Sequence, residues 1–167
     1  MMNLVFALLK DAFFAGIAAV GFGSISNLPY KSFPYCAMIA GIGHALRFYL
    51  INHCNVSIIW GSFFAALTIG FLSVFVGICI KQPAESLSSP SLLPMIPGMY
   101  AYRTFQHLLL CVSSEGQQEA FLSEFHLMFS NFLVGTLIVF MLAIGAIIPL
   151  LTFNKLTFQA TRNIKRY

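Results

Sequence analysis

The chain consists of long apolar stretches separated by short polar ones, and this pattern predicts membrane-spanning helices. A hydrocarbon layer about 30 Å thick requires about 20 apolar residues per helix. Four stretches reach that length without interruption, and a fifth is apolar but broken by prolines and a glycine. We therefore expect an all-α, polytopic integral membrane protein with five transmembrane helices in a single transmembrane domain, residues 1–167. The expected spans are about residues 4–25, 34–52, 56–80, 94–112 and 121–153, followed by a basic C-terminal tail at 154–167.

Composition excludes a soluble globule. The chain is 59% hydrophobic and 8% charged, whereas soluble domains carry about 25% charged residues. A soluble domain of this length has too much surface for its volume to hide so many apolar side chains. The runs are also longer than the alternating strands of membrane barrels, which have about ten residues. The net charge of +4 is scattered along the chain, so the expected partner is the lipid bilayer and not nucleic acid.

The charged residues between the spans divide by sign. Two polar segments, Lys81–Ser91 and Ser113–Ala120, are expected to be linkers. One side of the membrane then receives most of the charges as lysine and arginine, and the other receives only glutamate. The first set is Lys31, Lys81, Lys155, Arg162, Lys165, Arg166 and one acid, Glu85; the second is Glu115, Glu119 and Glu124. Because positively charged loops stay in the cytoplasm, we expect the N-terminus outside and the C-terminus inside.

Small residues recur at helical spacing in two spans. They let helix backbones approach closely in lipid, so these faces are expected to contact other helices, in this chain or in another. The two sets are Ala12, Gly16, Ala19 and Gly23 in the first span, and Ser62, Ala66, Gly70, Ser73 and Gly77 in the third.

Three ionisable residues within the first two spans are candidates for function, because charge inside a membrane is costly and tends to face an interior or a cavity. Asp11 could load and release a proton if it is desolvated, or it could be a partner of Lys10 or a wet interfacial residue. His44 and Arg47 lie three residues apart, on one helix face. His44 could relay protons, and Arg47 could bind a carboxylate, either Asp11 or one on a substrate. Alternatively, His44 is a packing residue and Arg47 extends to the interface.

The broken stretch contains Pro94, Pro97 and Gly98. Proline removes a backbone donor, and lipid offers no water to replace the lost hydrogen bond. Because proline suits the first helical position, we expect a short helix to begin at Pro97 inside the membrane. Its first amides and the nearby side chains would suit an anionic group, although a kink packed against a neighbouring helix is an alternative. Those side chains are Tyr100, Tyr102 and Arg103.

No motif for catalysis or for a metal appears. The histidines do not follow the HExxH pattern, no GxSxG elbow is present, and the four cysteines include no CxxC pair. The sequence therefore predicts neither an enzyme nor a cofactor, and the cysteines are expected to be packing residues.

Four short motifs resemble the small five-span subunit of the threonine/serine exporter family. They are the acidic residue in the first span (Asp11), "GHALR" (Gly43–Arg47), "PMIPGMYAY" (Pro94–Tyr102) and "NFLVGTLIV" (Asn131–Val139). In split members of that family, such a protein works with a larger multispan membrane subunit; in fused members, the same part is the C-terminal half of one chain. Members are implicated in proton-motive export of threonine and serine, and one split pair in export of succinate.

The resemblance implies a subunit of a bacterial inner-membrane exporter for small carboxylate-bearing metabolites. The expected substrate-binding residues lie on the cytoplasmic side, with Arg47 as a further candidate, and Asp11 and His44 are expected to handle coupling protons. Those cytoplasmic-side residues are Pro97, Gly98, Tyr100, Tyr102 and Arg103. Two other functions stay open: a structural subunit that assembles a membrane complex, and a homo-oligomeric channel, which would imply a higher oligomer.

Overall fold

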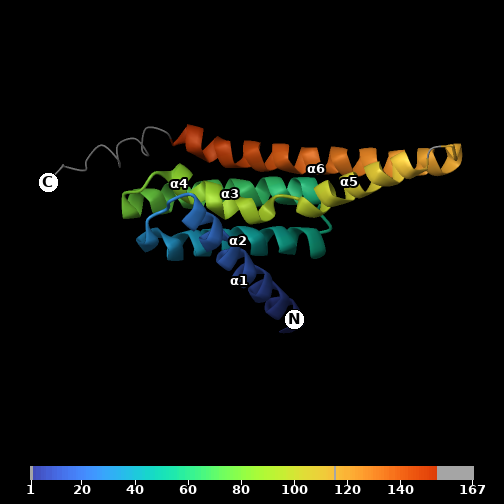
Figure 1. Ribbon diagram of the computed structural model, residues 1–167. Coiled ribbons are helices and arrows are strands. Elements are labelled where there is room, and N and C mark those ends of the chain that lie inside the picture. The colour runs from blue at the N-terminus through green and yellow to red at the C-terminus, as the bar shows by residue number, and fades with distance from the viewer. Residues whose placement is uncertain (1, 115, 154–167) are drawn as a thin grey trace. The chain divides into compact units, whose positions relative to one another are not determined.

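The computed structural model describes residues 2–114 and 116–153, and every regular element within them is helical. The all-α class is therefore confirmed. The elements are α1 (Met2–Ile25), a 3₁₀ turn (Tyr30–Ser32), α2 (Phe33–Asn52), α3 (Ile58–Ile80), α4 (Ala84–Leu92), a second 3₁₀ turn (Leu93–Met95), α5 (Gly98–Ser113) and α6 (Gln118–Thr152) (Figure 1). The basic tail at 154–167, with its four cationic residues, and Glu115 lie outside the described residues.

Three of the described helices are long and apolar enough to cross a membrane: Leu4–Ile25 within α1, Ile58–Ile80 and Gln118–Thr152. Helix α2 has 20 residues, but polar side chains such as His44 and Arg47 lower its mean hydropathy. Helix α5 has 16 residues, which rise about 24 Å and so stop short of a hydrocarbon layer about 30 Å thick. Five spans are therefore not confirmed, and the single transmembrane domain stays a prediction.

The segment expected to be the main polar linker, Lys81–Ser91, instead contains a buried helix. Lys81 ends α3 with a left-handed φ of 57°, and α4 begins two residues after Gln82. Five of the nine residues of α4 are buried: Ala84, Leu87, Ser88, Pro90 and Ser91. The linker prediction was wrong because small hydroxyl side chains can bond within their own helix. Ser91 Oγ, for example, donates to the carbonyl of Leu87 at 2.7 Å.

The stripes of small residues are packing faces, as their spacing predicts. All five members of the α3 stripe are buried. A Cβ at Gly70 would lie 2.9 Å from Pro149 Cγ and 3.0 Å from the Ala146 carbonyl of α6. On α1, a Cβ at Gly16 would lie 3.2 Å from the carbonyl of Ala37 in α2. Close backbone approach therefore fixes both helix pairs.

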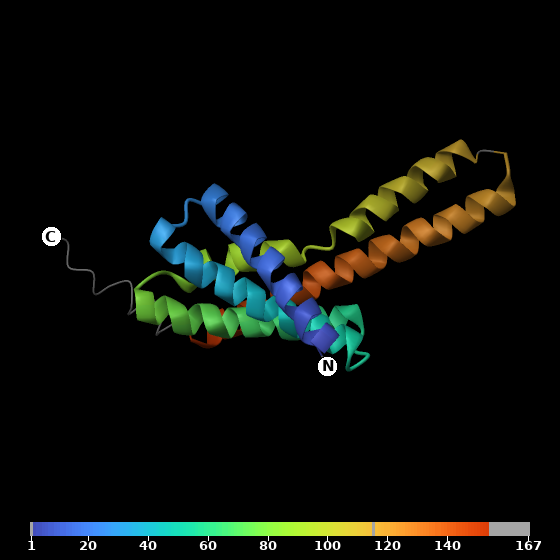
Figure 2. The same ribbon diagram turned by 90° about the horizontal axis from the view of Figure 1, so that it is seen from below.

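The chain divides into two compact units. Unit 1 consists of Met1–Met95 with Met141–Tyr167, and unit 2 consists of Ile96–Phe140. Unit 1 contains α1 to α4 and the end of α6, and its core includes the fully buried Ile69 and Leu87. In unit 2, α5 and the first part of α6 form an antiparallel hairpin (Figure 2). Gly116, in the turn of this hairpin, has a φ of 98°, which favours glycine.

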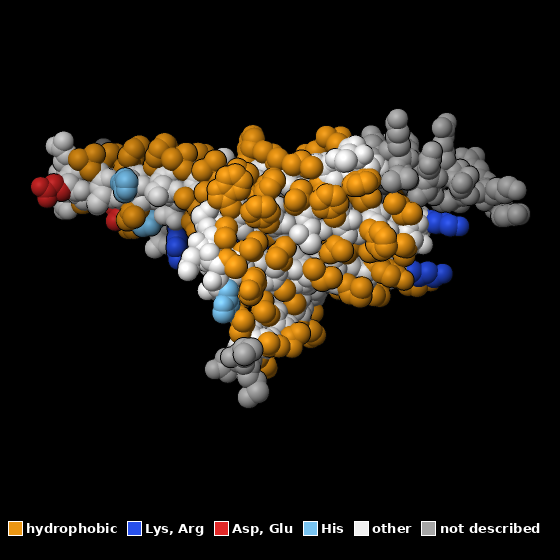
Figure 3. Space-filling model, turned by 180° about the vertical axis from the view of Figure 1, so that it is seen from behind, with side chains coloured by type: hydrophobic (Ala, Val, Ile, Leu, Met, Phe, Trp, Pro, Cys, Tyr) orange, Lys and Arg blue, Asp and Glu red, His pale blue; other side chains and the backbone are white. Residues whose placement is uncertain are grey.

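The outer surface of the helices is strongly apolar. Hydrophobic side chains cover most of the face shown in Figure 3, where charged side chains are few. Large side chains such as Phe105 and Leu109 are 66% and 68% exposed. Exposed apolar surface of this extent marks contact with a membrane or with other protein.

Candidate functional site

Asp11 and His44 meet in unit 1. His44 Nδ1, on α2, lies 3.2 Å from Asp11 Oδ2, on α1, and the two side chains are 15% and 36% exposed. Glycine makes this approach possible: a Cβ at Gly41 would lie 3.1 Å from the carbonyl of Ala12, the neighbour of Asp11. The sequence left open whether these groups meet, and their close contact now supplies a carboxylate and an imidazole that can share a proton.

Arg47 contacts the broken stretch. Its Nη1 donates to the carbonyl of Met95 at 3.1 Å, and Met95 is the fully buried last residue of the second 3₁₀ turn. A carbonyl at the end of a 3₁₀ turn lacks the backbone N–H donor that it would have inside an α-helix, and here the Arg47 guanidinium takes the place of that donor. The sequence suggested a carboxylate as the partner of Arg47; the structure places a backbone carbonyl there. Its contact with a substrate stays a prediction.

Gly43 opens the "GHALR" motif for a packing reason. A Cβ at this position would lie 2.5 Å from side-chain carbons of Ile69 and 3.2 Å from Met95 Cε. The motif therefore combines a close packing contact at Gly43, a proton-sharing contact at His44 and a hydrogen bond from Arg47 to the Met95 carbonyl. We call Asp11, His44, Arg47 and the Met95 carbonyl the polar centre. It joins three stretches that are distant in sequence.

A short helix does begin after Pro97, as the sequence predicts. Pro97 precedes the first residue of α5, Gly98. Two of the first amides already have acceptors, however: Gly98 N–H donates to the Ile96 carbonyl at 2.8 Å, and Tyr100 N–H donates to the Pro97 carbonyl at 3.0 Å. An anion at this helix start would have to compete with these bonds. No atom lies within 4 Å of a Cβ built at Gly98, so local packing does not require glycine there.

A cavity of about 400 Å³ lies within unit 2, between α5 and α6. Among the expected substrate residues, Pro97 lines it, while Tyr102 and Arg103 are exposed side chains elsewhere on α5. Three polar residues also line it: Thr104, and Asn131 and Thr136 of the "NFLVGTLIV" motif. The full lining is Ile96, Pro97, Ala101, Thr104, Phe105, Asn131, Phe132, Gly135, Thr136, Val139 and Phe140.

Comparison with known proteins establishes the family. The family model described as "Threonine/Serine exporter, ThrE" matches residues 11–152. The chain belongs to the threonine/serine exporter family. An uncharacterized protein of Haemophilus influenzae (strain ATCC 51907 / DSM 11121 / KW20 / Rd) is 34% identical over 148 residues, which cover 89% of this chain and 48% of that protein. The chain thus spans about half the length of this curated relative. No solved structure gives a significant match.

Within this ThrE-family chain, the motif stretches gather at two places. Asp11, "GHALR" and the start of "PMIPGMYAY" supply the polar centre of unit 1. "NFLVGTLIV" supplies five residues of the cavity lining in unit 2. The polar members of that stretch, Asn131 and Thr136, are a signal that could have identified the cavity, because hydroxyl and amide side chains are expensive inside a span.

Family membership and the three apolar helices together indicate a membrane protein of an exporter family. Within residues 2–114 and 116–153, no group of three or more His, Cys, Asp or Glu side chains could hold a metal ion. The chemistry that the polar centre offers is proton exchange and hydrogen bonding.

Proposed function

We propose that this chain is one part of a proton-coupled exporter in the bacterial inner membrane, which moves small carboxylate-bearing metabolites out of the cytoplasm. A larger multispan membrane subunit supplies the remainder. The proposal is supported by the family model over residues 11–152 and by a relative about twice as long. The N-terminus outside and the C-terminus in the cytoplasm belong to the same proposal.

The observation that carries proton coupling is the contact between Asp11 and His44. A carboxylate and an imidazole 3.2 Å apart can hold one proton between them and release it when a competing charge or water arrives. Both groups lie on helices whose outer faces are apolar, where each change of charge has a large energetic effect. Loading and unloading this pair would therefore favour different states of the transporter.

The cavity in unit 2 favours threonine or serine over a dicarboxylate as the substrate. Its lining contains no Lys, Arg, His, Asp or Glu, so a dicarboxylate would bring two negative charges to a site with no cation. Desolvating an unpaired charge is very unfavourable. A zwitterionic amino acid has no net charge. Thr104 Oγ1 and Asn131 Nδ2 already donate to the carbonyls of Tyr100 and Leu127, at 2.8 Å and 2.7 Å, so these side chains offer the substrate hydroxyl mainly acceptor lone pairs. The volume of the cavity, about 400 Å³, also lies within the usual range of small-molecule sites, about 300–1,000 Å³.

Export assays test this function. Cells that lack the chain are complemented with the native protein or with Asp11→Asn, and efflux of labelled threonine, serine and succinate is followed at several external pH values. We expect the native chain to restore efflux of threonine or serine that responds to pH and stops with a protonophore. Asp11→Asn, which preserves shape but cannot ionise, should remove the response, whereas the exposed Glu119→Gln should keep it. An Asp11→Asn chain that exports with an unchanged pH response contradicts proton coupling through this pair.

The partner is tested separately. A tag on the C-terminus and extraction of native membranes in mild detergent should recover a larger multispan protein in a fixed ratio. Recovery of this chain alone, as a uniform assembly, would contradict the half-transporter and favour a homo-oligomeric transporter or channel.

A further inference from the structure

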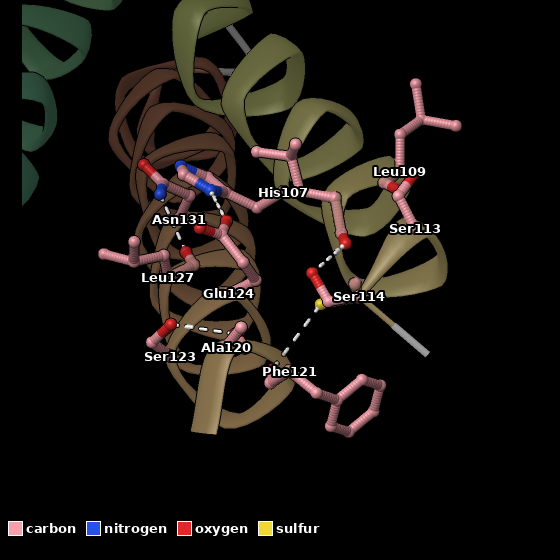
Figure 4. Close-up of polar contacts among 12 residues, drawn as sticks. His107, Leu109, Ser113, Ser114, Ala120, Phe121, Ser123, Glu124, Leu127 and Asn131 are labelled. Carbon is pink, nitrogen blue, oxygen red and sulfur yellow. Dashed lines mark hydrogen bonds and ion pairs between the residues drawn. The ribbon is translucent and has the colours of Figure 1, made fainter. Parts of the chain in front are cut away.

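A second imidazole–carboxylate contact lies in unit 2, outside the polar centre and outside the cavity lining. His107 Nδ1, on α5, is 2.7 Å from Glu124 Oε2, on α6 (Figure 4). The two side chains are 18% and 24% exposed. The contact therefore joins the two helices of the hairpin from the inside.

The position of this pair follows from the geometry of the hairpin. His107 lies seven residues before Ser114, and Glu124 lies seven residues after Gln117, so both stand at the same height above the turn. Gln117 N–H donates to the carbonyl of Ser114 at 3.0 Å, which closes the turn. One turn nearer to it, Cys111 Sγ lies 4.0 Å from the carbonyl of Phe121. The register of α5 against α6 thus brings the imidazole and the carboxylate together.

The hairpin turns this polar pair inward and its apolar side chains outward. Leu108, next to His107, is 42% exposed, and Phe125, next to Glu124, is 46% exposed. A soluble hairpin would show the reverse arrangement, so this one is suited to an apolar environment in which a change of charge strongly affects the contact. The other described charged or titratable groups of the hairpin are Tyr100, Tyr102, Arg103 and Cys111 on α5, and Glu119 and His126 on α6. Tyr102, Arg103, Glu119 and His126 are exposed, whereas Cys111 is buried one turn from the pair.

The strength of the contact depends on one proton. A histidine changes charge between about pH 5 and pH 8 in ordinary surroundings. With both ring nitrogens protonated, the ring and the carboxylate form a charge-assisted hydrogen bond; when the ring is neutral, Nδ1–H can still donate to the carboxylate, but the attraction between full charges is lost. The contact is therefore stronger when the ring carries both protons than when it is neutral.

We propose that His107 and Glu124 form a second proton-binding pair of the exporter, in which the bound proton holds α5 against α6. The effect would reach the cavity, because His107 is three residues from Thr104 and Glu124 is seven residues from Asn131, and these two residues line opposite walls. Its part in transport rests on the proposed function; its effect on the hairpin does not.

The first measurement therefore requires no transport. Hydrogen exchange of the backbone amides in α5 and in the first part of α6 is followed on the purified full chain in detergent, between about pH 5.5 and pH 8, after correction for the intrinsic pH dependence of exchange. We expect protection of the native hairpin to fall about fivefold toward the alkaline end, because the ion pair is replaced by a hydrogen bond from the neutral ring to the same carboxylate. His107→Gln can keep a hydrogen bond but cannot bind the proton, so its protection should not change with pH.

Matched variants separate this effect from a general one. His126→Gln and Glu119→Gln remove an exposed histidine and an exposed carboxylate from the same hairpin, and both should behave like the native chain. Glu124→Gln should remove the pH dependence as His107→Gln does. His107→Leu, which removes the hydrogen bond as well, should lose protection at every pH. If His107→Gln or Glu124→Gln keeps the native pH dependence, the proposal is wrong.

Export assays then test the role in transport. If the native chain exports, His107→Gln should shift or flatten the pH profile of export while the protein is produced in normal amounts. An unchanged pH profile would show that the pair is only a structural contact, and its role in coupling would be wrong. If the native chain exports none of the tested metabolites but its hairpin responds to pH as described, the proposed function fails while the proton-binding pair stands.

Discussion

The two units hold their helices together in different ways. In unit 1, glycine and other small residues bring backbones into contact, and large side chains such as Ile39, Ile69 and Leu87 are fully buried between them. In unit 2, most of the large apolar side chains face outward, and the contacts between α5 and α6 include a short polar one, from His107 to Glu124. Among the described residues, each unit contains one imidazole–carboxylate pair, so the same chemistry is found in two structural settings.

Because the two units are packed differently, a single proton should change the contact between helices in one unit and not in the other. In unit 1, the close approaches of Gly41 to Ala12 and of Gly16 to Ala37 hold α1 against α2 regardless of the charge on Asp11 and His44. Protonation of the pair should therefore alter binding and not the helix contact. In unit 2, fewer buried side chains hold α5 against α6, so protonation of His107 should alter the contact between these two helices. Substitutions in each unit test that contrast.

Gly145→Ala should cause the largest loss of stability. A Cβ at this position of α6 would lie 2.7 Å from the Phe63 carbonyl and 2.9 Å from Ala66 Cβ, so the backbones of α3 and α6 must separate. Overpacking of this kind costs about 3 kcal/mol in free energy of unfolding. Thermal or SDS unfolding of the purified chain measures it. Gly21→Ala, where no atom lies within 4 Å of the new Cβ, is the control, and equal stability of the two variants would contradict close packing in unit 1.

Arg47→Met should have the next largest effect. It preserves the apolar stem but removes the donor to the buried Met95 carbonyl, and leaving such an acceptor unsatisfied costs about 1–3 kcal/mol. Arg103→Met removes an exposed guanidinium from α5 and should change the free energy of unfolding by less than about 0.5 kcal/mol. The same unfolding measurement compares the two. If Arg47→Met is as stable as Arg103→Met, the hydrogen bond from Arg47 to the Met95 carbonyl makes no net contribution to the free energy of unfolding.

The two proton-binding pairs should differ in coupling energy. Double-mutant cycles with Asp11→Asn and His44→Gln, and with Glu124→Gln and His107→Gln, measure the coupling energy of each pair. We expect the smaller value for the first pair, because Asp11 is over a third exposed. The second pair should give a larger value, because it is shorter and less exposed. A larger coupling energy for Asp11–His44 would contradict the view that helix contact depends more on the polar pair in unit 2 than in unit 1.

Periodicity and composition were enough to predict several parts of the fold. The apolar runs predicted an all-helical chain, the small residues predicted the packing faces of α1 and α3, and Pro97 predicted the start of a short helix. Each of these rests on a property of one segment: its length, its helical face or a missing backbone donor. The placement of Asp11 near His44 required one further step, the pairing of α1 with α2, which the spacing of small residues suggests but does not position.

The features that the sequence did not predict depend on contacts between segments. Lys81–Ser91 resembles a linker because serines are polar, but a serine that bonds to its own helix is small enough to be buried, as Ser91 is. Glu124 is assigned by its charge to the outer side of the membrane, and its pairing with His107 depends on the register of a hairpin. That register could have been found from their equal distances to the short turn between Ser114 and Gln117. The cavity required the facing surfaces of two helices, which the pattern along either helix alone does not bring together.

Gly135→Ala should have the smallest effect and gives the most direct test of the contrast between the units. It makes the same substitution in the same helix as Gly145→Ala, but in unit 2, where the new Cβ would meet only Tyr100 Cβ, at 3.2 Å. A few tenths of an ångström of movement by α5 would relieve that contact, and alanine favours a helix over glycine by up to about 1 kcal/mol. The two effects oppose each other, so the free energy of unfolding should change by less than about 1 kcal/mol. A loss as large as that of Gly145→Ala would show that α5 cannot move away from α6. The hairpin would then be held as rigidly as unit 1, and a proton at His107 could not govern its opening.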